Sequence, residues 1–433
     1  MKPARFGVVI AALLGCAGAK DEPPPSTAIC GARPEIDGVC VGVSEAPICG
    51  ATACTDGVTC ARVHTVDGAA ALDAAAAGAV SGDCLALLPG SYGALAVAPG
   101  VHVLGRGQTA VKVKSVRVSG AGRSLVRGIS VESGGIVSVR ATLEIDRVAV
   151  RGAADRAIDV TDADVLVRET TLDGGGAGGL VSRCNGACAP GKRPKVTLRT
   201  TWLHDQRRLG VLARSVDVDL SHVVIERTHA SSFLFGRGVE VAARSTIQAR
   251  MVRIADSEDA AIAMFDSAGT LGPGLELLRP ARGVHFQGLP EGGVVLDGFV
   301  VEDASAVAVS IGASSRGVTV RNGRLSRTKM LRVPVDIGGM EDVGDGIEWG
   351  EGAQAFIEPS VRIETSARRP AVLKATAEGR FAATLAGGDE RVGVFVVGAT
   401  GPASHPALTF GDGIKVEYGD KVPMGVDPGS LPP

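Results

Sequence analysis

The chain has 433 residues, of which 45% are hydrophobic but only 3% aromatic, and it contains 60 glycines. Apolar volume must therefore come from small branched side chains and alanine, which suit stacked β-strands better than one large globular core. The 45 basic and 47 acidic residues give a formal net charge of -2, which excludes an overall field that would attract nucleic acid or an anionic membrane.

The first 15 residues have the pattern of a signal peptide. Lys2 and Arg5 precede an apolar stretch, residues 6–14, that is too short to span a bilayer. The tetrapeptide at its end, Leu13-Leu14-Gly15-Cys16, resembles the lipobox of bacterial lipoproteins.

The resemblance to bacterial lipoproteins implies that Cys16 becomes the acylated N-terminus of the mature chain. Several acyl chains would hold the protein stably, whereas one chain alone binds a membrane only marginally. We therefore expect an exported protein, anchored in the cell envelope at the outer membrane, with residues 16–29 as a Pro-rich tether. Ordinary secretory cleavage near Ala17-Gly18-Ala19 is the alternative.

Cysteine counting supports export. Without Cys16 the nine cysteines become eight, an even number that favours disulfides in an oxidising compartment. Residues 30–65 are expected to form a Cys-rich disulfide segment, and the early cysteines are Cys30, Cys40, Cys49, Cys54, Cys60 and Cys84. Their pairing is left open. Cys184 and Cys188 lie in the turn-rich RCNGACAPGK, where they could close a small loop.

A zinc site is the alternative use of these cysteines. No histidine stands at ligand spacing beside them, and thiols of exported proteins usually oxidise. We therefore expect no metal here.

Residues 66–107 contain an Ala-rich stretch followed by Gly82 to Tyr92, which fit the pattern GDxLxLxPGxY. This segment resembles the beginning of pectate-lyase-like β-helices. The resemblance implies that an Ala-rich helix caps the first coil and that the GDxLxLxPGxY element opens the first strand. Such a cap would cover strand edges and apolar core that an open end exposes.

A repeat extends from residue 124 onward. Apolar residues recur at an anchor position and at two, five and seven positions before it, as in Val196, Leu198, Thr201 and Leu203. Two period-two alternations separated by an extra polar residue predict two short strands joined by a sharp corner. A third strand follows each pair, as in AIDV at 157–160 and GVEV at 238–241. Three strands per repeat indicate one coil of a parallel β-helix.

The spacing of the anchors supports this interpretation. The anchors are Val131, Val150, Leu172, Leu203, Ile225, Ile254, Val301 and Leu325. They predict about 24 residues per coil, with residues 275–286 as a degenerate coil in the widest gap. Right-handedness follows from the general rule for parallel crossovers.

The predicted fold is therefore all-β: a single-stranded right-handed parallel β-helix solenoid over residues 66–398, with at least nine coils and an N-terminal helical cap. Beyond Leu325 the repeat weakens. Residues 329–354, which include Trp349, are expected to be an irregular insertion, and residues 399–433 a Gly/Pro-rich C-terminal cover.

One group of polar residues is a candidate site. Residues at equal offset from the anchors form columns of near neighbours, about 4.8 Å apart. The columns place His204, Asp205, Glu226, Arg227 and Asp256 on one turn face. Such carboxylates beside a histidine and an arginine could serve a glycoside hydrolase, or a lyase that uses Ca²⁺. Alternating aspartate and arginine is better explained as a solvated turn column that avoids stacking like charges.

Other features argue against a polysaccharide enzyme. The chain has two tryptophans and two tyrosines, and Trp202 alone lies beside the candidate site, so a long groove of sugar-stacking rings is not expected. The paired aspartates, His-Gly and Arg-x-Lys elements of polygalacturonases are missing, as is a clear pectate lyase calcium motif. His285 is expected to point outward from its strand.

We therefore favour a non-catalytic cell-envelope lipoprotein that presents a rigid β-helix for binding or as a structural surface component. Its expected partners are the membrane, through the lipid anchor, and a carbohydrate or surface protein, with no cofactor. The alternative is a polysaccharide lyase or glycoside hydrolase of the pectate-lyase-like superfamily, because a fold alone does not determine activity.

Overall fold

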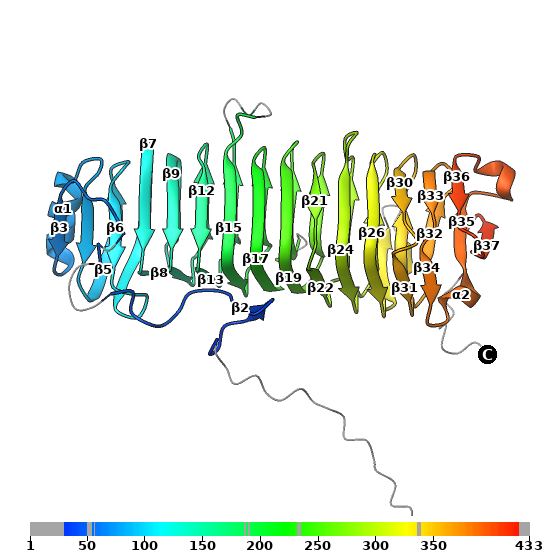
Figure 1. The fold of residues 1–433 in the computed structure, drawn as a ribbon, viewed down its shortest axis with the longest axis horizontal. Coiled ribbons are helices and arrows are strands. Elements are labelled where there is room, and N and C mark those ends of the chain that lie inside the picture. The colour runs from blue at the N-terminus through cyan, green and yellow to red at the C-terminus, as the bar shows by residue number, and fades with distance from the viewer. Residues whose placement is uncertain are drawn as a thin grey trace, which may run out of the picture.

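The computed structural model describes residues 30–49, 54–55, 57–185, 188, 191–231, 235–335 and 339–423. Within these residues the protein is all-β, with two short α-helices and one 3₁₀ turn, Pro402–Ser404, beside its strands. Of these strands, 33 join through hydrogen bonds into one set with parallel pairing. Figure 1 shows them side by side along the long axis of the molecule.

The parallel pairing repeats along the chain, and we call each repeat a rung. Leu203 lies beside Ile225, and Ile225 beside Ile254, so that each rung lies on the one before it. Three series of strands run through the rungs.

The first series follows the sharp corner and consists of β8 (Ser130–Glu132), β10 (Ala149–Arg151), β13 (Thr171–Asp173), the second halves of β15 (Lys195–His204), β17 (Asp217–Thr228) and β19 (Thr246–Ser257), then β22 (Leu275–Leu278), the second halves of β24 (Val294–Glu302) and β26 (Val318–Ser326), β31 (Arg362–Glu364) and β34 (Thr384–Ala386).

The second series consists of the first half of β9 (Ile136–Asp146), β11 (Arg156–Thr161), β14 (Gly178–Arg183), β16 (Leu209–Arg214), β18 (Arg237–Ala242), β20 (Ala260–Phe265), β23 (Arg282–Gln287), β25 (Val307–Ile311), β29 (Asp345–Trp349), β32 (Ala371–Lys374), β35 (Val394–Val397) and β37 (Val416–Gly419).

The third series consists of the second half of β9, β12 (Val165–Arg168), the first halves of β15, β17 and β19, β21 (Ala268–Leu271), the first halves of β24 and β26, β30 (Gln354–Ile357), β33 (Glu378–Phe381) and β36 (Leu408–Phe410). The first rungs are built by β3 (Val63–Val66), β4 (Cys84–Leu87), β5 (Gly90–Val97), β6 (His102–Gly105) and β7 (Val111–Arg127).

The inward column predicted from the repeat is confirmed. Its predicted members pair in register and are fully buried: Val150, Leu172, Leu203, Ile225, Ile254 and Val301. Leu277, from the expected degenerate coil, lies between Ile254 and Val301. Alternate residues of a strand face opposite ways, so the period of two places these side chains in the core. Each contributes about 1.5–3 kcal/mol by its burial.

The N-terminal end is closed by helix α1 (Ala69–Gly78), which buries Leu72. Asp83 of the GDxLxLxPGxY element accepts hydrogen bonds from Arg62 Nε (3.1 Å), Arg62 Nη2 (2.6 Å) and the backbone N–H of Val80 (2.9 Å). The hydrogen bonds from Arg62, then that from Val80, hold the pKa of Asp83 well below its usual range. Tyr92 donates its hydroxyl to the Leu88 carbonyl at 2.7 Å. Both motif residues therefore fix the first rungs.

The eight cysteines outside the N-terminal segment all form disulfides. The pairs are Cys30–Cys40, Cys49–Cys54, Cys60–Cys84 and Cys184–Cys188. The small loop expected at Cys184 and Cys188 is confirmed, and the zinc alternative is excluded for these thiols. Cys16, with the expected signal peptide and tether, lies outside the described residues.

The C-terminal rungs differ from the expectation. The prediction that Trp349 lies in an irregular insertion is wrong, because Trp349 ends β29, pairs with Ile311 and Leu373, and is fully buried. The irregular part is an antiparallel hairpin of β27 (Leu331–Val335) and β28 (Gly339–Val343) that lengthens one rung and conceals the repeat. Parallel pairing also continues past residue 398 into β36 and β37.

Asp389, at the start of helix α2 (Asp389–Val392), gives the C-terminal rungs a pH dependence. Burial raises the pKa of Asp389 from 3.8 to about 6, against hydrogen bonds from Ser366 that lower it. The folded chain favours the protonated form, so stability present below the unfolded pKa is lost as the pH rises through the folded value. We expect a loss of about 3 kcal/mol between roughly pH 4 and 7. Urea unfolding across this range should show the loss in the wild type, whereas identical profiles for wild type and Asp389→Asn would contradict it.

Candidate functional site

The predicted site lies where strands β15 and β17 end. His204 is the last residue of β15. It lies beside Asp173 of the preceding rung and Glu226 of the following rung, in the predicted register. Asp205 and Arg227 follow directly and have positive φ values of 54° and 53°. This left-handed conformation turns the chain sharply after the first strand series. From here on we call this second bend, which carries Asp205 and Arg227, the corner.

The corner holds a tight ion pair. Arg227 donates from Nε to Asp205 Oδ1 (2.7 Å) and from Nη2 to Asp205 Oδ2 (2.9 Å). His204 Nδ1 lies 2.8 Å from Asp205 Oδ2. The hydrogen bonds from Arg227, opposed by partial burial and helped by His204, hold the pKa of Asp205 well below its usual range. Asp205 is therefore ionised at neutral pH and cannot act as a general acid there.

The same ion pair recurs along the corner column. Asp256 does not join Arg227 in a hydrogen bond but accepts two from Arg279 (2.7 and 2.8 Å). Two rungs after Asp256, Asp303 accepts two hydrogen bonds from Arg327 (3.2 and 2.8 Å). All six residues have positive φ between 53° and 57°. The interpretation of the alternating charges as a structural ladder is therefore supported.

Glu226 faces a different partner. The indole Nε1 of Trp202 donates a hydrogen bond to Glu226 Oε2 at 3.2 Å. The Trp202 and His204 rings lie 4.1 Å apart at an angle of 34°. Glu226 thus holds the indole rather than forming a pair with Asp205 across an open groove.

The N-terminal strap, residues 30–48, contains β1 (Glu35–Ile36) and β2 (Val39–Cys40) and crosses this face of the stack, as Figure 1 shows for β2. Ile36 and Val41 pack on Val224 and Trp202, which point outward from β17 and β15. Gly42 donates its N–H to the Thr200 carbonyl at 3.0 Å, and a Cβ there would lie 3.1 Å from Trp202 Cβ. Trp202 therefore anchors the strap to the rungs.

A cleft of about 570 Å³ lies between the strap and the rungs. We call it the strap cleft; its rung side is formed by Gln108, Arg151, Thr171, Asp173, Trp202 and His204. Arg151 donates to Ser130 Oγ (3.2 Å) and to Gln108 Oε1, so its guanidinium is held in place. Sequence reasoning did not select Arg151 or the strap as parts of a site. The apolar Trp202 and Val224 at outward positions were the signal for a covering segment.

Among the described residues, Asp173, His204 and Asp205 form a group whose geometry could suit a metal, because their donor atoms lie within 4.8 Å of one another. Both carboxylate oxygens of Asp205 already accept hydrogen bonds from the cation Arg227. Asp173 is then the remaining carboxylate of the group, and His204 offers nitrogen, whereas Ca²⁺ sites are built from several carboxylate and carbonyl oxygens together with water. The Ca²⁺ considered for a lyase therefore does not fit these residues.

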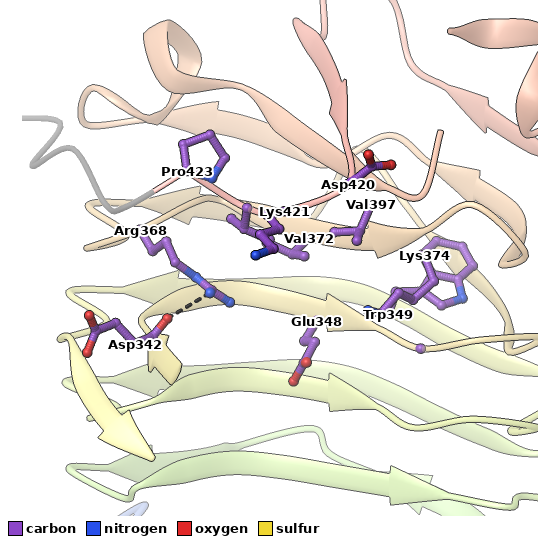
Figure 2. Close-up of a pocket in the computed structure, with 12 residues that line it drawn as sticks. Asp342, Glu348, Trp349, Arg368, Val372, Lys374, Val397, Asp420, Lys421 and Pro423 are labelled. Atoms are coloured by element: carbon purple, nitrogen blue, oxygen red, sulfur yellow. Dashed lines mark hydrogen bonds between the residues drawn. The ribbon is translucent and has the colours of Figure 1, made fainter. Parts of the chain in front are cut away.

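A second cleft, of about 400 Å³, lies near the C-terminus (Figure 2). Its wall residue Arg368 donates to the Asp342 carbonyl (2.7 Å) and to the carboxylate of Asp345, which is fully buried. Figure 2 shows Glu348, Lys374 and Lys421 around the opening. Because its guanidinium is bound on two sides, Arg368 serves to tie β28 to the rungs.

The corner ion pair should contribute measurably but modestly to stability. Replacing Arg227 with alanine leaves Asp205 without its cation, and we expect a cost of about 1 kcal/mol because the pair is half-exposed. Urea unfolding should separate this variant from Arg250→Ala, whose exposed arginine has no carboxylate within 4 Å among the described residues. Equal stabilities of the two variants would contradict the structural role.

His285, expected to point outward, is partly buried on β23, with Nδ1 3.2 Å from Ser310 Oγ. No described helix is long and apolar enough to cross a membrane. Comparison of the chain with protein-family models and with curated proteins finds no match.

Proposed function

We propose that the protein is a non-catalytic cell-envelope lipoprotein whose rigid body binds a small polar ligand, such as part of a carbohydrate, in the strap cleft. The observation that carries this proposal is that the acidic side chains of the candidate site are already bonded to other side chains of the protein. Asp205 and Asp256 are bound by arginines and Glu226 by Trp202, whereas the strap cleft beside them has room and polar groups. Such a concave site with few fixed polar groups is typical of ligand binding.

The body in this proposal is a right-handed parallel β-helix. Three strand series and rung-by-rung parallel pairing support a helical path of the chain. The handedness rests on the strong preference of parallel crossovers for the right-handed connection. A stack of this kind is stiff along its axis, because each rung is bonded to both neighbours.

Fluorescence of Trp202 tests ligand binding. The chain has two tryptophans, and Trp349 is fully buried, so a ligand in the strap cleft changes the emission of Trp202. The probes are oligogalacturonate, alginate oligomers, neutral glucan oligomers and muropeptides. We expect one class to shift the emission and to bind about tenfold more weakly to Arg151→Gln. No shift and no calorimetric binding with any class would contradict the proposal.

The lipid anchor has its own test. Cys16→Ser removes the proposed attachment thiol, so the protein should move from membranes to the soluble fraction and lose palmitate labelling. Ala17→Ser is a matched control that keeps the thiol. Palmitate labelling that persists in Cys16→Ser would show that the lipobox interpretation is wrong.

A further inference from the structure

A third cleft lies on a neighbouring face of the stack, near its N-terminal end. It has a volume of about 520 Å³ and is walled on one side by residues 57–59. Its other walls carry four arginines and two carboxylates: Arg123, Arg127, Arg147, Arg168, Glu144 and Asp146. We call it the arginine cleft.

Among the described residues, the arginines that line the arginine cleft outnumber the carboxylates that line it. Glu144 binds Arg123 (2.8 Å) and Arg168, and Asp146 lies 3.1 Å from Arg127 Nε. The remaining guanidinium, of Arg147, has its nearest carboxylate oxygens at 3.4 Å on Glu169, at the rim, and 3.8 Å on Asp146.

Two buried atoms show the same imbalance. Nε of Arg147 and Nε of Arg168 make no hydrogen bond within the described residues. Buried polar atoms normally have partners, so the hydrogen bonding of these two guanidiniums is incomplete within the described residues, although both lie near carboxylates. The terminal N–H groups of Arg147, and those of Arg168 that do not bind Glu144, are the donors that can meet an acceptor in the cleft.

The strand register adds a further cation. Arg127, Asp146, Arg168 and Arg199 occupy successive rungs of one column, so that Arg168 and Arg199 are adjacent like charges. Arg199 is exposed. The corner ladder, by contrast, matches each arginine with an aspartate. Adjacent like charges are unfavourable in a sheet unless something neutralises them.

His102 contributes a neutral donor. Burial, together with the nearby Arg123, lowers the pKa of His102, although Glu144 opposes this. Its Nδ1 accepts the backbone N–H of Leu125 at 3.1 Å, so the ring proton is on Nε2. The cleft therefore holds N–H donors of both charged and neutral kinds.

We infer that the arginine cleft binds a phosphate monoester, carried either by a soluble sugar phosphate or by a lipid headgroup. A dianion neutralises the excess charge better than a single carboxylate does, and guanidinium groups bind phosphate oxygens in pairs. This site is separate from the strap cleft and does not depend on it.

The test uses the full chain with Cys16→Ser, so that the lipid anchor does not itself bind vesicles. Calorimetry with glucose 6-phosphate tests the soluble source, and cosedimentation with vesicles containing phosphatidic acid tests the lipid source. Glucose, glucuronate and phosphatidylcholine vesicles are the controls. We expect at least one phosphate monoester to bind, and glucuronate to bind at least about tenfold more weakly.

The location is tested by two double variants of equal charge. Arg147→Gln with Arg168→Gln should weaken binding about tenfold or more, whereas Arg279→Gln with Arg327→Gln, in the corner ladder, should not change it. The exposed Arg123→Gln should weaken binding severalfold, which keeps the test decisive if the first double variant does not fold. No binding of either phosphate monoester, equal binding of glucuronate, or equal effects of the two double variants would overturn the inference.

Discussion

Leu203→Ala should lower the free energy of unfolding by about 3–5 kcal/mol, because it opens a cavity in the fully buried inward column. Its side chain lies between those of Leu172 and Ile225 on the adjacent rungs. The rungs leave little room for collapse into the cavity, since each is held by hydrogen bonds on both sides. Urea unfolding followed by circular dichroism measures the loss.

The matched control is an exposed residue of the same strand. Arg199 faces outward and is exposed, so Arg199→Ala should stay within about 0.5 kcal/mol of the wild type. A similar loss in both variants would mean that the alternation of inward and outward residues in β15 is misassigned.

Gly238→Val should destabilise the fold by about 3 kcal/mol or more through overpacking. A Cβ at Gly238 would lie 2.5 Å from Ile254 Cγ2 and 2.6 Å from the Ala261 carbonyl oxygen. The same close approach recurs where the second strand series begins, at Gly179, Gly210, Gly283 and Gly346. These glycines let the anchor side chains of the inward column pack against backbone.

Gly93→Val is the control for this substitution. Gly93 lies in strand β5, and a Cβ there would have no described heavy atom within 4 Å beyond its chain neighbours, so a side chain has space. Its variant should unfold within about 0.5 kcal/mol of the wild type. If Gly238→Val were equally harmless, the tight contact between rungs would not exist.

Much of the fold was predictable because the strands obey a local rule. The period of two and the corner between the two alternations before each anchor depend on neighbouring residues, so the column through Leu203 and Ile225 follows from the sequence. Trp349 was misplaced because the hairpin of β27 and β28 interrupts the spacing. The predicted stack, residues 66–398, was also too short, since β3 begins at Val63 and β36 and β37 lie beyond residue 398.

The candidate site was only partly predictable. The columns correctly joined His204, Asp205 and Arg227, because offset from an anchor fixes the position on the corner. They could not show that Arg279 forms the ion pair with Asp256. The coil that carries Arg279 is degenerate, so Leu277 was not recognised as its anchor. They also could not place the strap, because its contact with Trp202 joins residues far apart in the chain.

The most direct test of the central claim, that the corner charges are structural, is a turnover screen with pectic, alginate and host-type polysaccharides. His204 Nδ1 faces Asp205, the orientation of a general base, so a lyase or hydrolase would depend on His204 and Glu226. We expect no release of unsaturated or reducing ends from any polysaccharide. Release by the wild type that disappears in His204→Ala or Glu226→Gln, with stability nearly unchanged, would contradict this account.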